Sequence, residues 1–339
     1  MARAAGGDAA RNVAAHMKRA LRKGVKRMFS LLPIALRRHL LFFRSYGRWG
    51  SFNPPITYME KLNWRAISDR RAIMAFTADK LAAKEFVRQA LARTHLNVRI
   101  PETYWVGTDL RELQALASRL PKRWVLKPNH SCGRVQLADS THAPIDWDQL
   151  AIKTAHWLEL DDEYTVRGHW AYGQARRLLI AEERIGAGEH APDDLKIEGY
   201  HGEPAFTFWT TGRSIGAINY SNLKMDQTRL IWGHPSESAP DAPIPMEQLD
   251  QGVRAIALAL ASELSAPFDH LRVDGYAVDG EYWFGEITTY PAAGLGEISR
   301  ETDTWLGGLW KLPDLTAKDP REAEWRALLE GTPKGTLQQ

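Results

Sequence analysis

Cysteine is almost absent from this chain of 339 residues, in which Cys132 is the only one. A single thiol excludes a disulfide framework and a cysteine-rich zinc site. No apolar run reaches the roughly 18 residues that a membrane span needs. The best one, residues 28–43, contains a proline and three basic or histidine side chains, and it lacks the cleavage site of a signal peptide. We therefore expect a soluble cytoplasmic protein.

Several catalytic signatures are also missing. The sequence has no His-Glu-x-x-His, Gly-x-Ser-x-Gly or Cys-x-x-Cys motif, and neither the His-Arg-Asp nor the Asp-Phe-Gly motif of kinases. It has no Gly-x-x-x-x-Gly-Lys-Ser/Thr, and Gly294-Leu-Gly296 lacks the context of a dinucleotide fingerprint. These absences argue against zinc proteases, serine hydrolases, protein kinases, P-loop proteins and Rossmann dehydrogenases.

Acidic residues are scarce at the start of the chain. Residues 1–50 contain twelve Lys or Arg and one acid, Asp8, which leaves 32 basic against 40 acidic residues elsewhere. Because a nucleic-acid-binding domain carries its basic patch on the folded body, we expect no nucleic-acid partner. Residues 16–28 predict a basic helix that could contact an anionic membrane surface. An arm that is solvated, or docked on the acidic body, fits equally.

Helix and strand signals alternate after this arm. We expect helices at residues 57–66, 79–93, 109–120, 146–160 and 246–264, and strands at 103–107, 123–127, 135–138, 178–183, 195–200 and 205–211. Small, mainly antiparallel sheets mixed with helices predict the α+β class rather than a doubly wound fold. Four tryptophans within strands are expected to pack the core, namely Trp105, Trp124, Trp209 and Trp283.

The most informative stretch is residues 269–291, which predicts two strands joined by a short turn. Successive side chains of a strand alternate between its two faces. Arg272 and Asp274 therefore share one face, and so do Glu286 and Thr288. Two carboxylates, a hydroxyl and an arginine gathered on one face suit Mg²⁺ and phosphate oxygens. An amphipathic hairpin with a solvated polar face is the alternative.

The turn decides whether these two pairs share a face. A two-residue Asp279-Gly280 turn would put Asp274 and Glu286 on opposite faces. A three-residue turn that includes Val278, with Gly280 in the left-handed region, would bring all four side chains together. The metal site thus requires a turn with an odd number of residues.

A second stretch joins a buried-looking strand, ending at Lys127, to the polar loop Ser131-Cys132-Gly133. A lysine in this position can hold a phosphate by its charge, and a flexible loop can cover the phosphate with backbone N–H groups. An ordinary hairpin with a lysine at its mouth is the alternative.

Two further signals carry acids or a lysine. The strand at residues 178–183 ends in Glu182-Glu183, whose carboxylates could accept hydrogen bonds from an adenine amino group or ribose hydroxyls. Lys196 follows Asp193-Asp194 and could face the same cleft. Solvated acids and a surface salt-bridge cluster are the respective alternatives.

In their order along the chain, these stretches resemble the ATP-grasp superfamily, which includes D-alanine–D-alanine ligases. The likeness is closer to its TupA-like branch, named for teichuronopeptide biosynthesis, and runs with gaps from about Leu31 to Leu312. The motifs that carry it are Pro55-Ile-Thr-Tyr-Met-Glu-Lys-Leu-Asn-Trp64, Ala78-Asp79-Lys80, Leu126-Lys127-Pro-Asn-His130, Ile180-Ala-Glu-Glu183, Asp194-Leu-Lys196, Arg272-Val-Asp274 and Phe284-Gly-Glu-Ile-Thr-Thr-Tyr-Pro291.

The resemblance implies an ATP-grasp fold, in which two α+β lobes clamp ATP between antiparallel sheets behind a helical N-terminal lead-in. It implies a basic arm at residues 1–28, a helical region at 29–100, a small lobe with the phosphate-covering loop at 101–190 and a large lobe with the metal site at 191–312. The tail at 313–339 has little apolar content, and we expect it to fray.

The resemblance also implies roles for individual residues. Lys80 and Lys127 contact the phosphates of ATP, and Ser131, Cys132 and Gly133 cover them. Glu182 and Glu183 meet the adenine and ribose, and Ile185 and Lys196 complete the nucleotide site. The implied ligands of Mg²⁺ are Asp274, Glu286 and Thr288, and the implied catalytic residues are Lys127 and Arg272, the latter stabilising the transferring phosphoryl group.

The implied activity is an ATP- and Mg²⁺-dependent carboxylate–amine ligase that works through an acyl phosphate. Its substrate is a small molecule or a glycan precursor, as in teichuronopeptide-like polysaccharide synthesis. A phosphotransferase acting on a glycan with the same fold is one alternative. A non-catalytic nucleotide-binding scaffold is another, which the single glycine of the Ser131–Gly133 loop favours.

Overall fold

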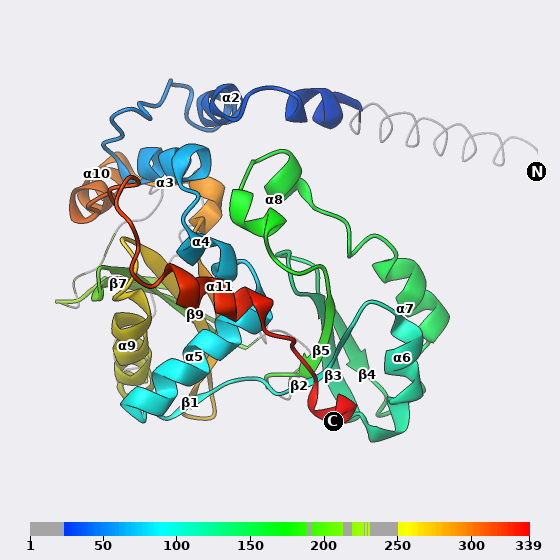
Figure 1. Cartoon of the computed structure of the whole chain (residues 1–339). Helices are drawn as coiled ribbons and strands as arrows, with labels where there is room; N and C mark the ends of the chain where they lie inside the picture. Colours follow the sequence, from blue (N-terminus) through cyan, green and yellow to red (C-terminus); the bar gives the residue numbers. More distant parts are fainter. Residues whose placement is uncertain are drawn as a thin grey trace, which may run out of the picture.

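The computed structural model describes residues 24–339 except 187, 189–191, 213–218, 227, 229 and 231–249. These residues form two lobes, each built on an antiparallel sheet, with helices packed around them (Figure 1). The α-helices are α2 (Ile34–Tyr46), α3 (Tyr58–Ser68), α4 (Ala72–Thr77), α5 (Lys80–Thr94), α6 (Leu110–Ala115), α7 (Trp147–Thr154), α8 (Asp162–Thr165), α9 (Gln251–Ser265), α10 (Arg300–Leu309) and α11 (Glu322–Glu330). Short 3₁₀ segments are η1 (Ala117–Arg119), η2 (Trp170–Gly173), η5 (Pro291–Gly294) and η6 (Thr336–Gln338).

The larger sheet has six strands in the order β1-β10-β9-β6-β7-β8. Neighbouring strands are antiparallel except β1 and β10, which are parallel. The strands are β1 (Val98–Arg99), β6 (Asp194–Tyr200), β7 (Glu203–Thr211), β8 (Asn219–Lys224), β9 (Leu271–Val278) and β10 (Glu281–Thr288).

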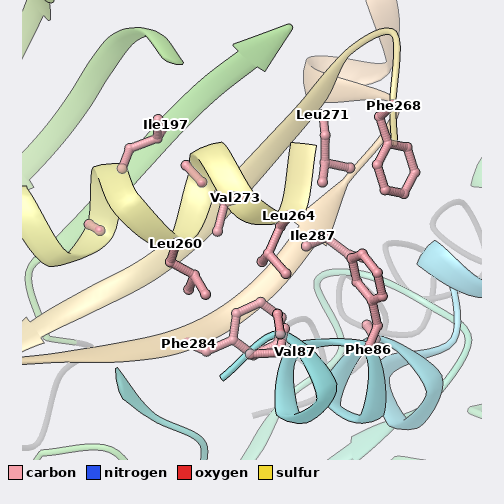
Figure 2. Close-up of a cluster of buried hydrophobic side chains, with 14 of the residues drawn as sticks. Phe86, Val87, Ile197, Leu260, Leu264, Phe268, Leu271, Val273, Phe284 and Ile287 are labelled. Atoms are coloured by element: carbon pink, nitrogen blue, oxygen red, sulfur yellow. The ribbon is translucent and has the colours of Figure 1, made fainter. Parts of the chain in front are cut away.

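One face of this sheet makes the main hydrophobic core. Side chains of α5 and α9 pack against the apolar side chains that β6, β9 and β10 turn toward the helices (Figure 2). Phe86 and Leu264 lie in this core together with Ile197, Val273 and Ile287. Since side chains alternate along a strand, the residues between these apolar ones point to the opposite face, toward the other lobe.

The smaller sheet has four strands in the order β2-β5-β3-β4, all antiparallel. They are β2 (Thr103–Gly107), β3 (Arg123–Pro128), β4 (Gln136–Asp139) and β5 (Leu179–Glu183). Helix α7 packs on this sheet through Leu150, which joins Trp105 and Trp124 in a second core. The predicted α+β class is therefore confirmed, as is the burial of the four strand tryptophans.

Two predicted helices are shorter than expected. The helix predicted at residues 109–120 ends as α6 at Ala115 and continues only as the 3₁₀ turn η1. The helix predicted at 146–160 ends as α7 at Thr154. There the Thr154 hydroxyl donates to the Leu150 carbonyl, and the chain turns so that Trp157 enters the small-lobe core.

Helix α3 ties the N-terminal region to the large lobe. It begins with the predicted capping box, in which Thr57 and Glu60 exchange hydrogen bonds with each other's backbone. From the same helix, the buried Arg65 donates to the carboxylate of Asp269 at 2.7 Å and to the carbonyl of Thr289 at 2.9 Å. The indole of Trp310 donates to the same carboxylate at 2.7 Å. Arg65, which directly follows the opening signature, thus anchors α3 on the large lobe through buried contacts.

The same arginine orients a buried histidine, His270. Arg65 lies 3.1 Å from Nδ1 of His270, and because a guanidinium only donates, Nδ1 must be the acceptor. The proton of the ring is then on Nε2, which donates to Glu198 at 2.5 Å. Tyr58 donates to the other oxygen of Glu198 at 3.1 Å. Burial lowers the pKa of His270, which agrees with a neutral ring.

The turn between β9 and β10 differs from the one that the metal site was expected to need. Val278 pairs with Glu281, so Asp279 and Gly280 form a two-residue turn with φ values of 52° and 76°. Positive φ at both positions is the type I′ geometry that matches the twist of a hairpin. This turn alone would put Asp274 and Glu286 on opposite faces.

A β-bulge in β10 returns them to one face. Phe284 pairs with Gly275 whereas Glu286 pairs with Asp274, so Gly285 is an additional residue in β10. One extra residue reverses the phase of every side chain that follows it. A Cβ at position 285 would lie 3.0 Å from the carbonyl oxygen of Asp274, which is why glycine suits this position. The inference that only an odd-length turn permits the metal site is therefore wrong.

The C-terminal tail does not fray as expected. Helix α11 buries Trp325 and Leu328 in the main core, where Trp325 stacks on Phe76 with ring centroids 5.5 Å apart. Further on, Gln338 exchanges hydrogen bonds with the backbone of Val106 in β2. The expectation failed because it weighed the low apolar content of the tail and overlooked two well-spaced apolar side chains on one helix.

The predicted basic helix at residues 16–28 lies mostly outside the described residues. Of this segment, residues 24–28 are described and are helical. Within the described part of the chain, the helices are too short or too polar to cross a bilayer.

Because Trp325 is buried against Phe76 and Phe86, we expect Trp325→Ala to lower the free energy of unfolding by about 3–5 kcal/mol. Urea denaturation followed by circular dichroism measures this loss. The matched control is Trp49→Ala, since Trp49 is exposed and should cost less than about 1 kcal/mol. Equal losses in the two variants would mean that α11 contributes little to the core.

Candidate nucleotide site

A cavity of about 440 Å³ lies between the two sheets. This volume is within the range of roughly 300–1,000 Å³ that small-molecule sites occupy. The cavity is lined by nine of the residues expected in a nucleotide site, namely Lys80, Lys127, Ser131, Cys132, Gly133, Glu182, Glu183, Ile185 and Glu286. These residues come from α5, the small-lobe sheet and its loop, and β10, so the fold brings together signals that are 206 positions apart at most in the sequence.

Glu182 is buried between two lysines. It forms ion pairs with Lys127 on the neighbouring strand β3 and, at 2.7 Å, with Lys84 on α5. Burial by itself would raise the pKa of Glu182, but the charges and hydrogen bonds of Lys127 and Lys84 outweigh it and lower the pKa to about 2. The Glu182 side chain therefore acts here as the counter-ion of the phosphate-binding lysine candidate, whereas Glu183 remains half-buried at the cavity wall.

Lys80 is held in place by the hydrogen bonds of the preceding residue, Asp79. Asp79 caps α5 through the backbone N–H of Ala82, and its carboxylate also accepts from Asn129 at 2.7 Å and from the guanidinium of Arg176. These bonds join α5, the end of β3 and the segment before β5. Lys80 then reaches the loop and donates to the carbonyl of Ser131 at 2.5 Å. Burial lowers the pKa of Lys80.

The loop after β3 combines a buried start with an open tip. Ser131 is buried and its hydroxyl finds no hydrogen-bond partner among the described residues. Cys132 is exposed, and Gly133 has a φ of 70° with no heavy atom near the position of a Cβ. A positive φ favours glycine, which populates this region without steric cost. The loop thus has one residue with a positive φ at its tip, and the Ser131 hydroxyl has no partner among the described residues.

The cleft-facing side of the large sheet carries the remaining candidates. Asp274 pairs across the strands with both Lys196 and Glu286, and Thr288 pairs with Arg272. Arg272 makes a bidentate ion pair with Asp274, with both N–O distances at 2.6 Å. Although burial opposes it, this carboxylate raises the pKa of Arg272 above its ordinary value.

Four of the predicted residues do not line the large cavity. Lys196, Arg272, Asp274 and Thr288 lie on the same sheet face beside it, and Lys196 is paired with Asp194. Thr288 lines a small adjoining cavity of about 20 Å³ with Tyr172, and Lys80 and Glu286 line this cavity as well as the large one. A cavity of this size has room for about one water molecule.

The donors on this face fit a Mg²⁺ ion that is also bound by phosphates. The described residues contain no cluster of three or more His, Cys, Asp or Glu side chains able to hold a metal by themselves. Mg²⁺, however, is commonly bound by one or two carboxylates together with phosphate oxygens and water. Glu286 has no ion-pair partner among the described residues and borders both cavities, so its carboxylate is available to such an ion.

Sequence reasoning missed three residues of the site. Lys84 lies one helical turn after Lys80, and this i, i+4 spacing was a usable signal because it places both on one face of α5. Tyr276 continues the two-residue period of Arg272 and Asp274 and lines the cavity. Asn129 was noticed only as part of a motif, and no sequence signal indicated its hydrogen bond to Asp79.

The ion pairs of Glu182 predict how stability depends on pH. A carboxyl whose pKa falls from 4.5 in the unfolded chain to about 2 in the folded one stabilises the protein above pH 4.5, by up to about 3 kcal/mol, and this contribution disappears as the pH falls toward 2. Urea denaturation of the wild type and Glu182→Gln should therefore show a stability difference that shrinks below pH 4.5. Glu183→Gln is the matched control for removing a carboxyl at this strand end. A difference for Glu182→Gln that stays constant down to pH 3 would contradict these ion pairs.

Three solved structures with low similarity to this chain are two ligases and a synthetase. The D-alanine–D-alanine ligase of Bacillus anthracis complexed with ATP is 14% identical with a TM-score of 0.35, covering 75% of this chain and 63% of that one. The Helicobacter pylori D-alanine–D-alanine ligase is 13% identical (TM-score 0.38; 70% and 62%), and the D-cycloserine synthetase DcsG is 18% identical (TM-score 0.37; 69% and 70%). The chain thus spans less than two thirds of either D-alanine–D-alanine ligase.

A comparison with curated proteins finds no match. The model of one protein family, the TupA-like ATP-grasp family, matches residues 60–311, which is well over half of the chain. The match includes both sheets and every candidate residue named above from Lys80 to Thr288. The chain belongs to the TupA-like ATP-grasp family.

Proposed function

We propose that the protein is an ATP- and Mg²⁺-dependent ligase that joins a carboxylate to an amine through an acyl phosphate. The observation that carries this proposal is the convergence of Lys80, Lys127, the Ser131–Gly133 loop and Glu286 on one cavity between the two sheets. Family membership supports nucleotide binding in this cleft. A glycan precursor as substrate rests only on the biosynthesis for which the family is named.

In this proposal the lysines bind the triphosphate. Lys80 and Lys127 both line the cavity, so their charges can contact phosphate oxygens there. Lys127 is held by Glu182 in the absence of a ligand, which keeps its ammonium group in place at the cavity wall. The half-buried Glu183 and the backbone near Ile185 are positioned for the ribose and adenine.

Asp274, Glu286 and Thr288 would hold Mg²⁺, which when bound neutralises charge on the phosphates. Asp274 can contribute while it keeps Arg272 in position, because a carboxylate has about four lone-pair sites. Arg272 lies two residues before Asp274 on the same face of β9. Its guanidinium can bind an equatorial oxygen of the transferring phosphoryl group.

The bond changes balance without another reactant. An oxygen of the substrate carboxylate attacks the γ-phosphorus, the bond to the bridging oxygen breaks, and ADP leaves. The amine nitrogen then attacks the acyl carbon, phosphate leaves with the former carboxylate oxygen, and the amine loses a proton to give an amide. The site mainly orients the reactants and neutralises charge, while the Ser131–Gly133 loop excludes water that would hydrolyse the acyl phosphate.

We expect Glu286→Gln to lower turnover by about two orders of magnitude or more, since several kcal/mol of charge stabilisation are lost. ADP release that requires both a carboxylate and an amine, across a screen of amino acids and uronic acids, is the measurement. Glu281→Gln, at the far end of the same strand, is the matched control and should retain activity.

The products separate this proposal from its alternatives. An amide product supports the ligase, whereas ADP release with a stable phosphorylated product would replace it with a phosphotransferase. If Mg-ATP binds but the wild type releases no more ADP than Glu286→Gln with any substrate of the screen, the protein is a nucleotide-binding scaffold.

The loop gives a second prediction. An L side chain at position 133 is strained by its positive φ but meets no neighbouring atom, so Gly133→Ala should leave folding intact and disfavour the loop conformation by about 1–2 kcal/mol. We expect ATP affinity, measured by calorimetry, to fall by roughly five- to thirty-fold. Gly308→Ala is the control, because it also has open space but no positive φ. Unchanged ATP affinity in Gly133→Ala would show that the loop does not cover the nucleotide in this conformation.

A further inference from the structure

The outer side of α2 is an apolar stripe that no part of the described structure covers. Leu36, Leu40 and Phe43 recur at the i, i+4 and i+7 positions and are 44%, 36% and 44% exposed. Trp49, just after the helix, extends the stripe, with its ring centroid 5.0 Å from that of Phe43. Met28 and Leu31, which precede the helix in the sequence, are exposed apolar side chains as well. Helix α2 lies along the edge of the molecule, away from both sheets (Figure 1).

The inner side of α2 fixes the direction of this stripe. Arg38 is fully buried, donates to Asn63 at 2.8 Å and to the carbonyl of Ala293 at 2.7 Å, and thereby anchors the helix on the large lobe. Arg37 donates to the carbonyl of Thr165, the last residue of α8, at 2.7 Å. With this side held by buried hydrogen bonds, α2 cannot rotate to hide its apolar stripe without breaking them.

The segment that carries the stripe is basic in sequence, although two of its cations pair with acids elsewhere in the fold. Between Asp8 and Glu60 the sequence has no acidic residue, whereas it has eleven Lys or Arg. Among the described ones, Arg27 and Arg44 are exposed and have no ion-pair partner in the described part of the chain. A solvent-facing helix usually mixes both signs, which form stabilising i, i+4 pairs.

We propose that the outer side of α2, together with Trp49, docks on the surface of an anionic lipid bilayer. An apolar stripe flanked by cations, with a tryptophan at its end, is the pattern of helices that lie in the bilayer interface. Each nearby Lys or Arg adds attraction to anionic headgroups. A second copy of this chain meeting the same side would bring cation against cation, so charge favours the bilayer over self-association.

Docking in this way would set the orientation of the whole protein. Because Arg37 connects α2 to the segment after α8, the bilayer would lie on the side of the molecule where the N-terminal helices meet the small lobe. The basic residues of the N-terminal arm would add electrostatic attraction to the same surface. This inference does not depend on the ligase reaction.

The test uses the full chain and vesicles of phosphatidylcholine with about one third phosphatidylserine, compared with phosphatidylcholine alone. We expect the wild type to co-sediment with the anionic vesicles and the double variant Leu40→Ser with Phe43→Ser to bind at least about tenfold more weakly. Ile152→Ser with Leu315→Ser is the matched control, since these side chains are exposed elsewhere on the molecule. ATP affinity and circular dichroism should be unchanged in both, which separates lost docking from lost folding or lost nucleotide binding.

Each other outcome overturns the proposal. Equal binding of the wild type and the α2 variant would show that the stripe does not dock. Equal binding to neutral and anionic vesicles would show that the flanking cations are not involved. If analytical ultracentrifugation finds a wild-type dimer that the α2 variant lacks, the stripe is an interface with a second copy.

A chain lacking residues 1–28 should bind anionic vesicles more weakly than the wild type but more strongly than it binds neutral ones.

Discussion

The site depends most on one backbone irregularity, the β-bulge at Gly285 in β10. Before the bulge, Phe284 faces the helices of the core, and after it Ile287 does, although the two residues are an odd number apart. That change of phase lets β10 fill the core on one side and present Glu286 and Thr288 to the cleft on the other. Without it, the type I′ turn would direct Glu286 into the main core, where an unpaired carboxylate would cost several kcal/mol.

The rest of the cleft is organised by pairing opposite charges before any ligand binds. Glu182 holds Lys127 and Lys84, Asp274 holds Arg272, and Asp79 connects the elements under Lys80. Buried ions persist when they are paired and hydrogen-bonded, and these pairs keep the cationic groups fixed at the cavity wall. The arrangement agrees with a site whose work is to position a charged substrate and neutralise it, since such a site gains from groups that need not reorganise during the reaction.

Much of the fold could be predicted from the sequence, because the periodicity of apolar residues and the residues that cap helices are local signals. The Thr57 capping box and the strands that end at Lys127 and Glu183 occur where they were expected. The geometry of the hairpin could not be predicted, because a bulge depends on how two strands pack and not on the turn between them. Nor could the pairing of Glu182 with two lysines, one on a neighbouring strand and one on a helix that starts about a hundred residues earlier. The prediction that the tail frays failed for a similar reason, because Trp325 is buried by residues that are distant in the sequence.

We propose that Asp274 and Glu286, which the bulge brings opposite each other, hold the metal that accompanies ATP. A crystal structure of the full chain grown with Mn²⁺ in place of Mg²⁺ and a non-hydrolysable ATP analogue tests it directly, because Mn²⁺ gives an anomalous signal. We expect a peak within coordination distance of Glu286 and Asp274, and phosphate oxygens between this ion and the lysines Lys80 and Lys127. A nucleotide bound in the cavity with the metal held elsewhere, away from both carboxylates, would contradict it.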